Sequence, residues 1–243
     1  MRALILRLEA PLMSFGTVAV DEIRPTDTLP GLSMVAGLAA NALGLDFGRT
    51  GELQQLQDRI RYAARLDREG ASLVDYQTAL LGNKDMALHT RPFHYVGRKG
   101  AATGDTVTVQ RYRHYRMDAG VTLALALADG PGPTLDDLEN ALKLPARPLF
   151  LGRLCCPPGE FLYRGERIEA ASLREALEKV PRLSRPTSYD APLFAQWPDE
   201  PGEEQGRVLW KTDVRDWLND VHAGGRYVRQ GRIPCPPPGR DNA

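Results

Sequence analysis

The sequence has few cysteines, no long hydrophobic run and no net charge, and each of these absences narrows what the protein can be. Its three cysteines include the adjacent pair Cys155 and Cys156, and none of them belongs to a Cys-x-x-Cys pair. A zinc site and a structural disulfide are therefore not expected. No apolar run approaches the roughly 20 residues that are needed to cross a bilayer. We therefore expect a cytoplasmic protein without a membrane partner.

Charge balance and missing motifs exclude further classes. The chain has 31 basic and 31 acidic residues, so no global electric field attracts nucleic acid. Any such binding must depend on a local surface or on partner subunits. The sequence contains no P-loop, no dinucleotide-binding fingerprint and no His-Glu-x-x-His motif. We predict neither a cofactor nor a metal site.

One window, residues 84–116, concentrates basic, histidine and aromatic side chains. It holds seven Lys and Arg residues against two acids. The basic residues are Lys84, Arg91, Arg98, Lys99, Arg111, Arg113 and Arg116. The histidine and aromatic residues are His89, His94, His114, Phe93, Tyr95, Tyr112 and Tyr115. Cationic groups neutralise phosphates, and aromatic and guanidinium planes stack on unpaired bases. We interpret the window as a basic arm that grips single-stranded RNA, and the alternative is a solvated hairpin.

Hydrophobic spacing and turn residues predict the elements around this arm. We expect a strand over 3–9, a helix from Pro30-Gly31 to about Leu45 that Gly44 ends, and a hairpin of strands 59–67 and 72–78. A buried strand over 121–127 follows, and then a helix over 135–144 that begins with a capping pair of Thr134 and Asp137. This order is compatible with a ferredoxin-like β-α-β-β-α-β unit. For Ser33 and Gly37, the small residues of the first predicted helix, the preferred interpretation is close packing of the helix against a sheet.

The C-terminal third has a different pattern. We expect a short strand over 161–163, a helix over 172–180, an acidic and proline-rich loop over 197–204, and late strands over 207–210 and 226–233. The predicted organisation is α+β, with a first domain over 1–158 that carries the basic β-hairpin as an insertion at about 80–112. A small domain over 159–233 and a disordered tail over 234–243 follow.

The run from Arg111 to Arg116 also permits a catalytic hypothesis. A metal-independent ribonuclease needs a base near a 2′-hydroxyl and cations around the phosphate. His114 with Tyr115, or with Tyr112, could supply these groups. However, strand alternation places Arg111, Arg113 and Tyr115 on one face and the other three residues on the opposite face. A binding face and a packing face explain the run without chemistry.

Several segments, taken in order, resemble a known family. They are Leu-x-Leu-x-x-Pro-Leu-x-Ser-Phe-Gly at 6–16, Arg-Pro-Thr at 24–26, Pro-Gly-Leu-Ser-x-x-x-Gly-Leu-x-Ala-x-x-Leu-Gly at 30–44, Asp-Tyr-Gln-Thr at 75–78, Arg-x-Tyr-x-x-Asp at 113–118 and Leu-Gly-Arg-x-x-Cys-Pro at 151–157. Together they resemble the CRISPR-associated RAMP subunit that caps the crRNA 5′ handle in type I Cascade complexes, most closely its type I-E version. The resemblance covers about residues 3–160.

The resemblance implies a fold, partners and a set of RNA-binding residues. The implied fold is a ferredoxin-like (RRM/RAMP) core with a β-hairpin thumb and a small C-terminal domain, and the thumb would be the basic arm. The implied partners are the crRNA 5′ handle, the Cascade backbone and large subunits and, through the complex, target DNA. The implied RNA-binding residues outside the basic window are Ser14, Gly16, Arg24, Ser33, Tyr76, Thr78 and Arg153, and those inside it are the seven basic residues and His89.

The resemblance implies a non-catalytic, RNA-binding subunit of an antiviral defence complex. Two alternatives to this role stay open. In the related type I-C systems this subunit cuts pre-crRNA, so His114 and Tyr115 could belong to a processing endoribonuclease. A structural scaffold without RNA contact is the other alternative.

Overall fold

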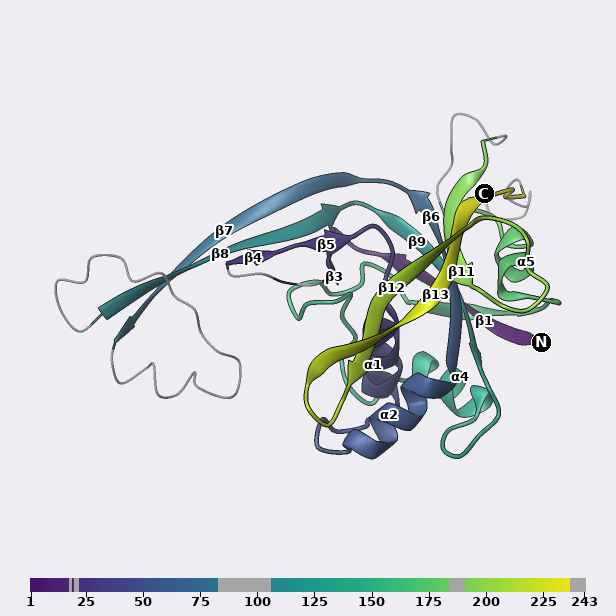
Figure 1. Cartoon of the computed structure of the whole chain (residues 1–243), viewed down its shortest axis with the longest axis horizontal. Helices are drawn as coiled ribbons and strands as arrows, with labels where there is room; N and C mark the ends of the chain where they lie inside the picture. Colours follow the sequence, from purple (N-terminus) through teal and green to yellow (C-terminus); the bar gives the residue numbers. More distant parts are fainter. Residues whose placement is uncertain (18, 20–21, 83–105, 184–190, 237–243) are drawn as a thin grey trace.

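The computed structural model describes residues 1–17, 19, 22–82, 106–183 and 191–236. Its largest sheet has seven antiparallel strands in the order β10-β1-β9-β6-β11-β13-β12 (Figure 1). These strands are β1 (Arg2–Glu9), β6 (Ile60–Arg68), β9 (Gly120–Leu127), β10 (Tyr163–Glu169), β11 (Leu193–Pro198), β12 (Arg207–Asp216) and β13 (Val221–Ile233). The chain is therefore an α+β protein in which antiparallel pairing predominates, as the sequence predicts.

Helices cover the central strands of this sheet on both faces. They are α1 (Leu32–Leu43), α2 (Thr50–Arg59), α4 (Leu135–Lys143) and α5 (Leu173–Glu178). Residues of α1, α2 and α4 share one hydrophobic core with Leu4, Leu6 and Leu8 of β1, whereas α5 shares the second core with Ala3 and Ile5. Side chains on both faces of these strands are thus removed from water. This explains the nearly continuous apolar sequence of β9, and the predicted buried strand is confirmed.

The C-terminal end of α1 and the N-terminal end of α4 lie where local sequence signals predict them, whereas the start of α1 is stabilised by a residue far away in the sequence. Gly44 ends α1 in the left-handed conformation at φ 76°, and Thr134 and Asp137 form the expected capping box of α4. The first helix lacks a side-chain cap from its own N-cap residue, Gly31. Instead the Leu32 N–H donates to Asp213 Oδ2 of β12, at 2.8 Å. A carboxylate 181 positions away therefore stabilises the start of α1.

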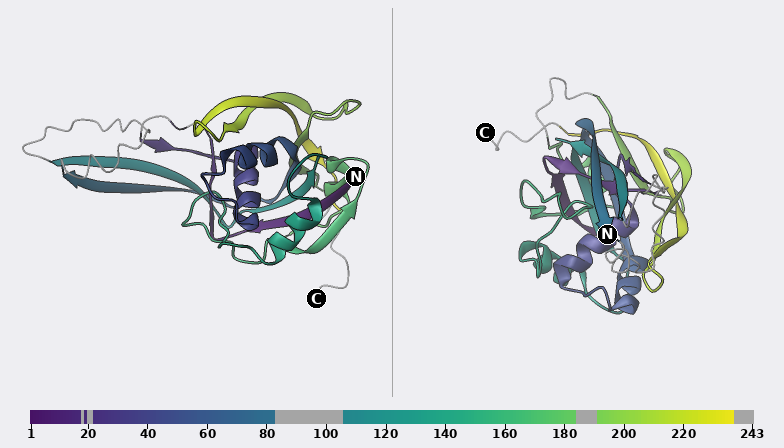
Figure 2. Two further views of the ribbon diagram at one scale, coloured as in Figure 1. Left: turned by 90° about the horizontal axis from the view of Figure 1, so that it is seen from below. Right: turned by 90° about the vertical axis from the view of Figure 1, so that its left-hand side faces the viewer.

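A long β-hairpin, which we call the arm, extends away from the body of the molecule (Figures 1 and 2). It consists of β7 (Ala71–Gly82) and β8 (Thr106–Met117), which pair antiparallel over the whole of both strands. The prediction that residues 72–78 pair with 59–67 is wrong, because β6 pairs with β9 and β11 in the large sheet. The arm also begins at Ala71, nearer the body than the expected insertion at about 80–112.

Gly70 is the point at which the chain leaves the large sheet for the arm. Its φ is +68°, and a Cβ added there would meet the Met117 carbonyl oxygen at 2.1 Å. Only glycine fits both the positive φ and this close approach of the two arm strands. The sequence identifies this turn correctly, but the turn joins two sheets rather than two strands of one hairpin.

Four short strands attach the first part of the chain to the arm. They are β2 (Leu12–Met13), β3 (Phe15–Gly16), β4 (Ile23–Arg24) and β5 (Thr26–Asp27). Strand β2 pairs antiparallel and β4 pairs parallel with β8, while β3 and β5 pair with each other. The segment that carries the Ser-Phe-Gly and Arg-Pro-Thr motifs is thus fixed at the base of the arm.

The C-terminal third joins the same large sheet. Strands from both sides of the expected boundary at 158/159 belong to it, because β10 flanks β1, β9 and β6 on one side and β11, β13 and β12 flank them on the other; the division into two domains stays a prediction. Helix α5 is confirmed, and the two late strands are confirmed but longer than expected. The strand expected at 161–163 lies at Tyr163–Glu169, and the first two residues of the expected acidic loop belong to β11. Residues 237–243 of the expected tail lie outside the described residues.

No helix among the described residues is long and apolar enough to cross a membrane. The same part of the chain contains no cluster of three or more histidine, cysteine or acidic residues that could hold a metal ion.

Candidate nucleic-acid interface

One face of the arm presents exposed aromatic side chains. Tyr76 of β7 and Tyr112 of β8 stand directly opposite each other, with ring centroids 5.0 Å apart. They are 51% and 38% exposed, and Ile23, the neighbour of Tyr112 on its other side, is 48% exposed. Thr78 and Val74 are also exposed on β7. Rings that lie against a strand surface and face water can stack on unpaired bases.

The opposite face of the arm brings two arginines together. Arg24 of β4 and Arg113 of β8 are register partners in the parallel pair of these strands, and Asp75 is the partner of Arg113 on β7. Arg113 makes no hydrogen bond or ion pair with any described residue. The Asp75 carboxylate instead accepts a hydrogen bond from Gln77 at 2.5 Å. Arg111 is half-buried two residues further along β8. Two arginines in register on neighbouring strands, with one carboxylate in register on the third strand, make the arm base a candidate cationic site.

Arg153 and Ser14 join the segments that meet below this site. Arg153 donates from Nη1 to the His114 carbonyl at 3.1 Å and from Nη2 to the Arg24 carbonyl at 3.0 Å. Its guanidinium also lies 4.6 Å from the centroid of the Tyr115 ring. The Ser14 hydroxyl, 1% exposed, donates to the same His114 carbonyl at 3.2 Å. Both side chains therefore position the backbone of β8 and β4, which uses the Ser14 hydroxyl and one donor from each terminal nitrogen of Arg153.

The two residues of the catalytic hypothesis point away from each other. Tyr115 is 3% exposed and its hydroxyl lies 3.4 Å from Cys155 Sγ. Burial, and then the hydrogen bond with Cys155, raise the pKa of Tyr115 above its ordinary value. The phenol is therefore protonated at neutral pH and cannot act as a base. His114 adjoins Tyr115 on the strand and so projects from its other face.

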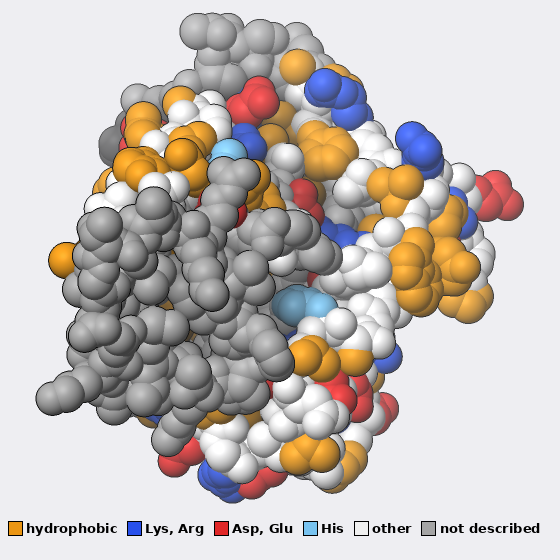
Figure 3. All heavy atoms as spheres, turned by 60° about the vertical axis from the view of Figure 1, so that its left-hand side comes forward, with side chains coloured by type: hydrophobic (Ala, Val, Ile, Leu, Met, Phe, Trp, Pro, Cys, Tyr) orange, Lys and Arg blue, Asp and Glu red, His pale blue; other side chains and the backbone are white. Residues whose placement is uncertain are grey.

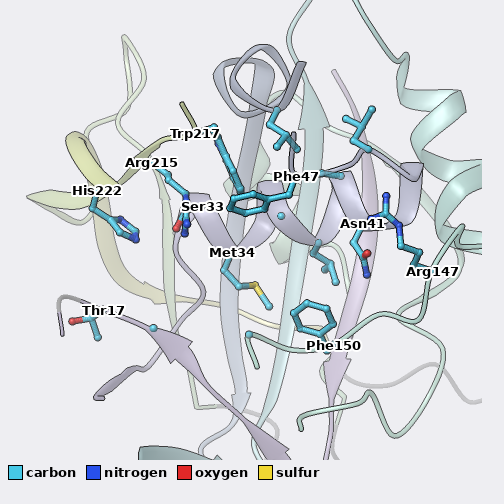
Figure 4. A pocket seen from close by; sticks show the side chains of 17 residues that line it. Thr17, Ser33, Met34, Asn41, Phe47, Arg147, Phe150, Arg215, Trp217 and His222 are labelled. Atoms are coloured by element: carbon cyan, nitrogen blue, oxygen red, sulfur yellow. The ribbon is translucent and has the colours of Figure 1, made fainter. Parts of the chain in front are cut away.

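A groove beside α1 is the second candidate surface. Ser33, Gly37 and Asn41 recur at four-residue intervals on α1 and so form one face of the helix. The groove has a volume of about 390 Å³. Figure 4 shows Asn41 and Arg147 at one end, Arg215 and His222 at the other, and Met34 and Phe47 between them. Its other lining residues are Gly16, Thr17, Leu38, Ala40, Leu45, Leu53, Phe150, Gly152 and Trp217.

Gly37 faces this groove and leaves space in it. A Cβ added at Gly37 would meet only the Trp217 ring within 4 Å, at 3.7 Å. No described residue of the large sheet lies within 4 Å of that Cβ, so close packing of α1 on the sheet does not require the glycine. Gly16 borders the groove as well, and no atom lies within 4 Å of a Cβ added there.

Helix α2, which the sequence did not predict, holds the far wall of the groove. The fully buried Gln57 accepts from Trp217 Nε1 at 3.1 Å and from the Arg215 N–H at 3.3 Å. Its amide also donates to the Arg215 carbonyl at 2.8 Å. The Arg215 guanidinium then lies 5.0 Å from the ring centroid of Trp217 and 5.9 Å from that of Phe47. One amide thus fixes an aromatic and cationic wall.

The electrostatics of the groove come from its two arginines. Arg147 forms an ion pair with the exposed Asp46 at 3.2 Å, and Arg215 pairs with Asp220. Burial lowers the pKa of Arg215, but a guanidinium starts so far above neutrality that it stays charged. Burial, and then the charge of Arg215, lower the pKa of His222. The imidazole at this end of the groove is therefore neutral at pH 7.

The structure distributes the predicted residues over both surfaces. Gly16 and Ser33 border the groove, whereas Ser14, Arg24, Tyr76, Thr78, Arg111, Arg113 and Arg153 belong to the arm or its base. Arg116 lies at the arm base too, where its Nη2 donates to the Glu69 carbonyl at 2.6 Å. Lys84, His89, Arg91, Arg98 and Lys99 lie outside the described residues.

Figure 3 shows the molecule from the side on which the arm points toward the viewer. Over the described part, cationic and anionic side chains are interspersed among exposed hydrophobic ones. No field of a single sign covers it, so recognition depends on the individual sites above. The sequence missed Phe47, Gln57, Arg215 and Trp217, because they approach α1 only in the folded chain.

Comparison with known proteins gives consistent matches. Residues 3–229 match the family described as CRISPR-associated protein (Cas_Cas5). The CRISPR system Cascade subunit CasD of Escherichia coli (strain K12) is 31% identical over 170 residues, which are 67% of this chain and 70% of that protein.

Solved structures match over nearly the whole chain. One is described as "Crystal structure of Cas protein", with a TM-score of 0.65 and 28% identity over 97% of this chain and 100% of that one. A chain of a "CRISPR RNA-guided surveillance complex" has a TM-score of 0.66 and 26% identity over 98% of this chain and 95% of that one. Because the family match runs from residue 3 to residue 229, this chain belongs to the CRISPR-associated Cas5 family.

Proposed function

We propose that this protein is a non-catalytic subunit of a CRISPR RNA-guided surveillance complex and that it holds the 5′ handle of the crRNA. The observation that carries the proposal is the arm base, where Arg24 is in register with Arg113, an arginine with no hydrogen bond or ion pair to any described residue. This chain is similar to a Cascade subunit and to a chain of a surveillance complex. Its arm base would suit the phosphate backbone of a bound RNA.

Each surface would contribute a different interaction. The guanidinium pair would neutralise handle phosphates, which gives affinity and register without reading sequence. Tyr76 and Tyr112 would stack on bases that leave the single strand. The groove beside α1 would take a further part of the handle, since it combines two arginines with aromatic walls. A subunit with no net charge can bind RNA in this way because the cations are concentrated locally.

The fold supports the same role. Strands β10, β1, β9 and β6 lie in the order 4-1-3-2 of a β-α-β-β-α-β unit, with α1 and α4 on one face. We assign this unit as the ferredoxin-like core and the arm as the thumb. The backbone and large subunits of the complex would contact the remaining surface, and target DNA would be reached through them.

The endoribonuclease alternative has weaker support. A general base and a second catalytic group must reach one phosphate together. His114 and Tyr115 project from opposite faces of β8, and the buried Tyr115 hydroxyl contacts Cys155. Tyr112 shares the face of His114, but Arg113, which would be the cation beside the phosphate, lies on the other face.

The proposal is tested by binding of repeat-derived RNA to the Arg113→Ala variant. Loss of one phosphate contact should weaken binding about tenfold at low salt and reduce the slope of log affinity against log salt by about one. Arg2→Ala is the matched control, because Arg2 is an exposed arginine at the end of β1 far from the arm (Figure 1). Equal affinities of the two variants, measured with the partner subunits present, would refute the role of the arm base.

A further inference from the structure

The groove beside α1 has the features of a site for one nucleotide. Its volume of about 390 Å³ lies near the lower end of the range for small-molecule sites, about 300–1,000 Å³. Gly37 presents no side chain to the groove, so a flat ring can lie close to the backbone of α1 there, beside the Trp217 ring that a Cβ at this position would contact at 3.7 Å. Phe47 and Phe150 supply aromatic surface (Figure 4). An arginine at each end of the groove can meet the phosphates on either side of a bound nucleoside.

Asn41 gives this groove a polar group of defined direction. Its Nδ2 donates to the Pro148 carbonyl at 2.7 Å. A carbonyl oxygen only accepts, so the amide must turn its NH2 group toward Pro148 and its Oδ1 atom away from it. Among the described residues no donor reaches Oδ1. The groove wall therefore presents a fixed hydrogen-bond acceptor to its contents.

A fixed acceptor discriminates between bases. Adenine and cytosine carry an exocyclic amine at C6 and C4, where guanine and uracil carry a carbonyl oxygen. The amine would donate to Asn41 Oδ1, whereas a carbonyl would place two acceptors against each other and leave both unsatisfied.

We infer that this groove is a subsite for a single unstacked adenine or cytosine, which Asn41 selects through the exocyclic amine. The inference rests on the proposed function, because the base would belong to the crRNA handle. Asn41 is a specificity residue in this scheme, and Gly37, Phe47 and Phe150 shape the space for the ring.

The test replaces single amines in the RNA. Repeat-derived RNA is synthesised with purine riboside at one adenosine at a time, or with 2-pyrimidinone riboside at one cytidine at a time, which deletes only the amine. Affinity is measured by fluorescence anisotropy in the presence of the partner subunits. One position should lose about three- to tenfold in affinity with the unaltered protein, as one hydrogen bond predicts.

The Asn41→Ala variant should bind the unmodified RNA more weakly by the same factor and show no further loss at that position. Alanine favours a helix, so this change at a half-buried position preserves folding, and thermal unfolding checks that it does. Asn140→Ala is the matched control, because Asn140 is exposed on α4 and does not line the groove.

The outcomes separate the two proposals. If the protein binds the handle but no single exocyclic amine affects its affinity, the subsite is overturned and the RNA-binding function stands. The same holds if the effect of one amine on affinity persists in Asn41→Ala. Preference for guanine or uracil at the sensitive position overturns the subsite as well. Absence of RNA binding even with the partner subunits present overturns both.

Discussion

Removal of the Asp213 carboxylate should destabilise the protein far more than removal of an exposed acid. Its Oδ2 caps the first turn of α1 at Leu32, and both carboxylate oxygens accept from Arg226 at 3.0 Å. Arg226 also donates to the Tyr62 hydroxyl at 2.7 Å, and Tyr62 donates to the Pro30 carbonyl. The carboxylate therefore joins β12 and β13 to the start of α1, beside the groove.

The magnitude follows from two losses in the Asp213→Ala variant. A lost N-cap costs about 0.5–2 kcal/mol, and a buried cation without its partner costs about 3–5 kcal/mol. The Arg226 side chain is still 20% exposed and Asp213 is 6% exposed, so the second loss is reduced. Arg226 also keeps its contact with Tyr62. We expect a decrease of about 2–4 kcal/mol in the free energy of unfolding.

Urea denaturation followed by tryptophan fluorescence measures this change. The control is Glu52→Ala, which breaks an ion pair with Arg49 whose side chains are 47% and 53% exposed. An exposed pair contributes about 0–1 kcal/mol. The Asp213→Asn variant keeps an acceptor for Leu32 and should fall between the two. A cost for Asp213→Ala no larger than that for Glu52→Ala would refute the structural role assigned to this carboxylate.

Three further predictions concern the groove. Gly37→Ala should raise the free energy of unfolding by up to about 1 kcal/mol, because alanine favours a helix interior, yet it should weaken RNA binding by narrowing the groove. Calorimetry and fluorescence anisotropy on the same variant measure both quantities, and an increase of stability together with an increase of RNA affinity would contradict this prediction. Gln57→Leu leaves Trp217 Nε1 and the Arg215 backbone without partners, so it should cost about 1–3 kcal/mol and red-shift tryptophan emission, and an unchanged spectrum would contradict the proposed support. Because the pKa of His222 is lowered in the folded protein, the unfolded chain binds the proton of this imidazole more tightly. The free energy of unfolding should therefore fall as the pH decreases below about 6.5. Measured from pH 7.5 to 5, the free energy of unfolding of the His222→Asn variant should lack this part of the pH dependence.

The elements that could be predicted from sequence are those with local causes. Gly44 must end α1 because a left-handed residue follows the last turn, and the capping box of Thr134 and Asp137 is complete within four positions. Alternation alone also separates the two faces of β8, which the buried Tyr115 and the exposed Tyr112 confirm.

The partner of β7 is not a local property. Two residues separate β6 from β7, which favours a hairpin, but β6 packs in the covered sheet between β9 and β11. The exposed side chains of β7 gain nothing from that core, so this strand pairs with β8 outside it.

The site followed the same division. The resemblance predicts Ser14, Arg24 and Arg153 as RNA-binding residues, which stays a prediction, and the structure brings their segments together at the base of the arm through the His114 and Arg24 carbonyls. By contrast, the contact between Gln57 and Trp217 spans 160 positions. No periodicity or motif connects two such residues, so the groove wall could be recognised only in the folded chain.

The most direct test of the central claim incubates the purified protein with labelled repeat RNA, without metal ions, and examines binding and cleavage on one gel. The experiment is repeated with the partner subunits. The account predicts a shifted, uncut RNA whose binding weakens in Arg113→Ala and changes little in His114→Ala. A single cut that disappears in His114→Ala would make this protein a processing endoribonuclease, and no binding under either condition would contradict the handle-holding role.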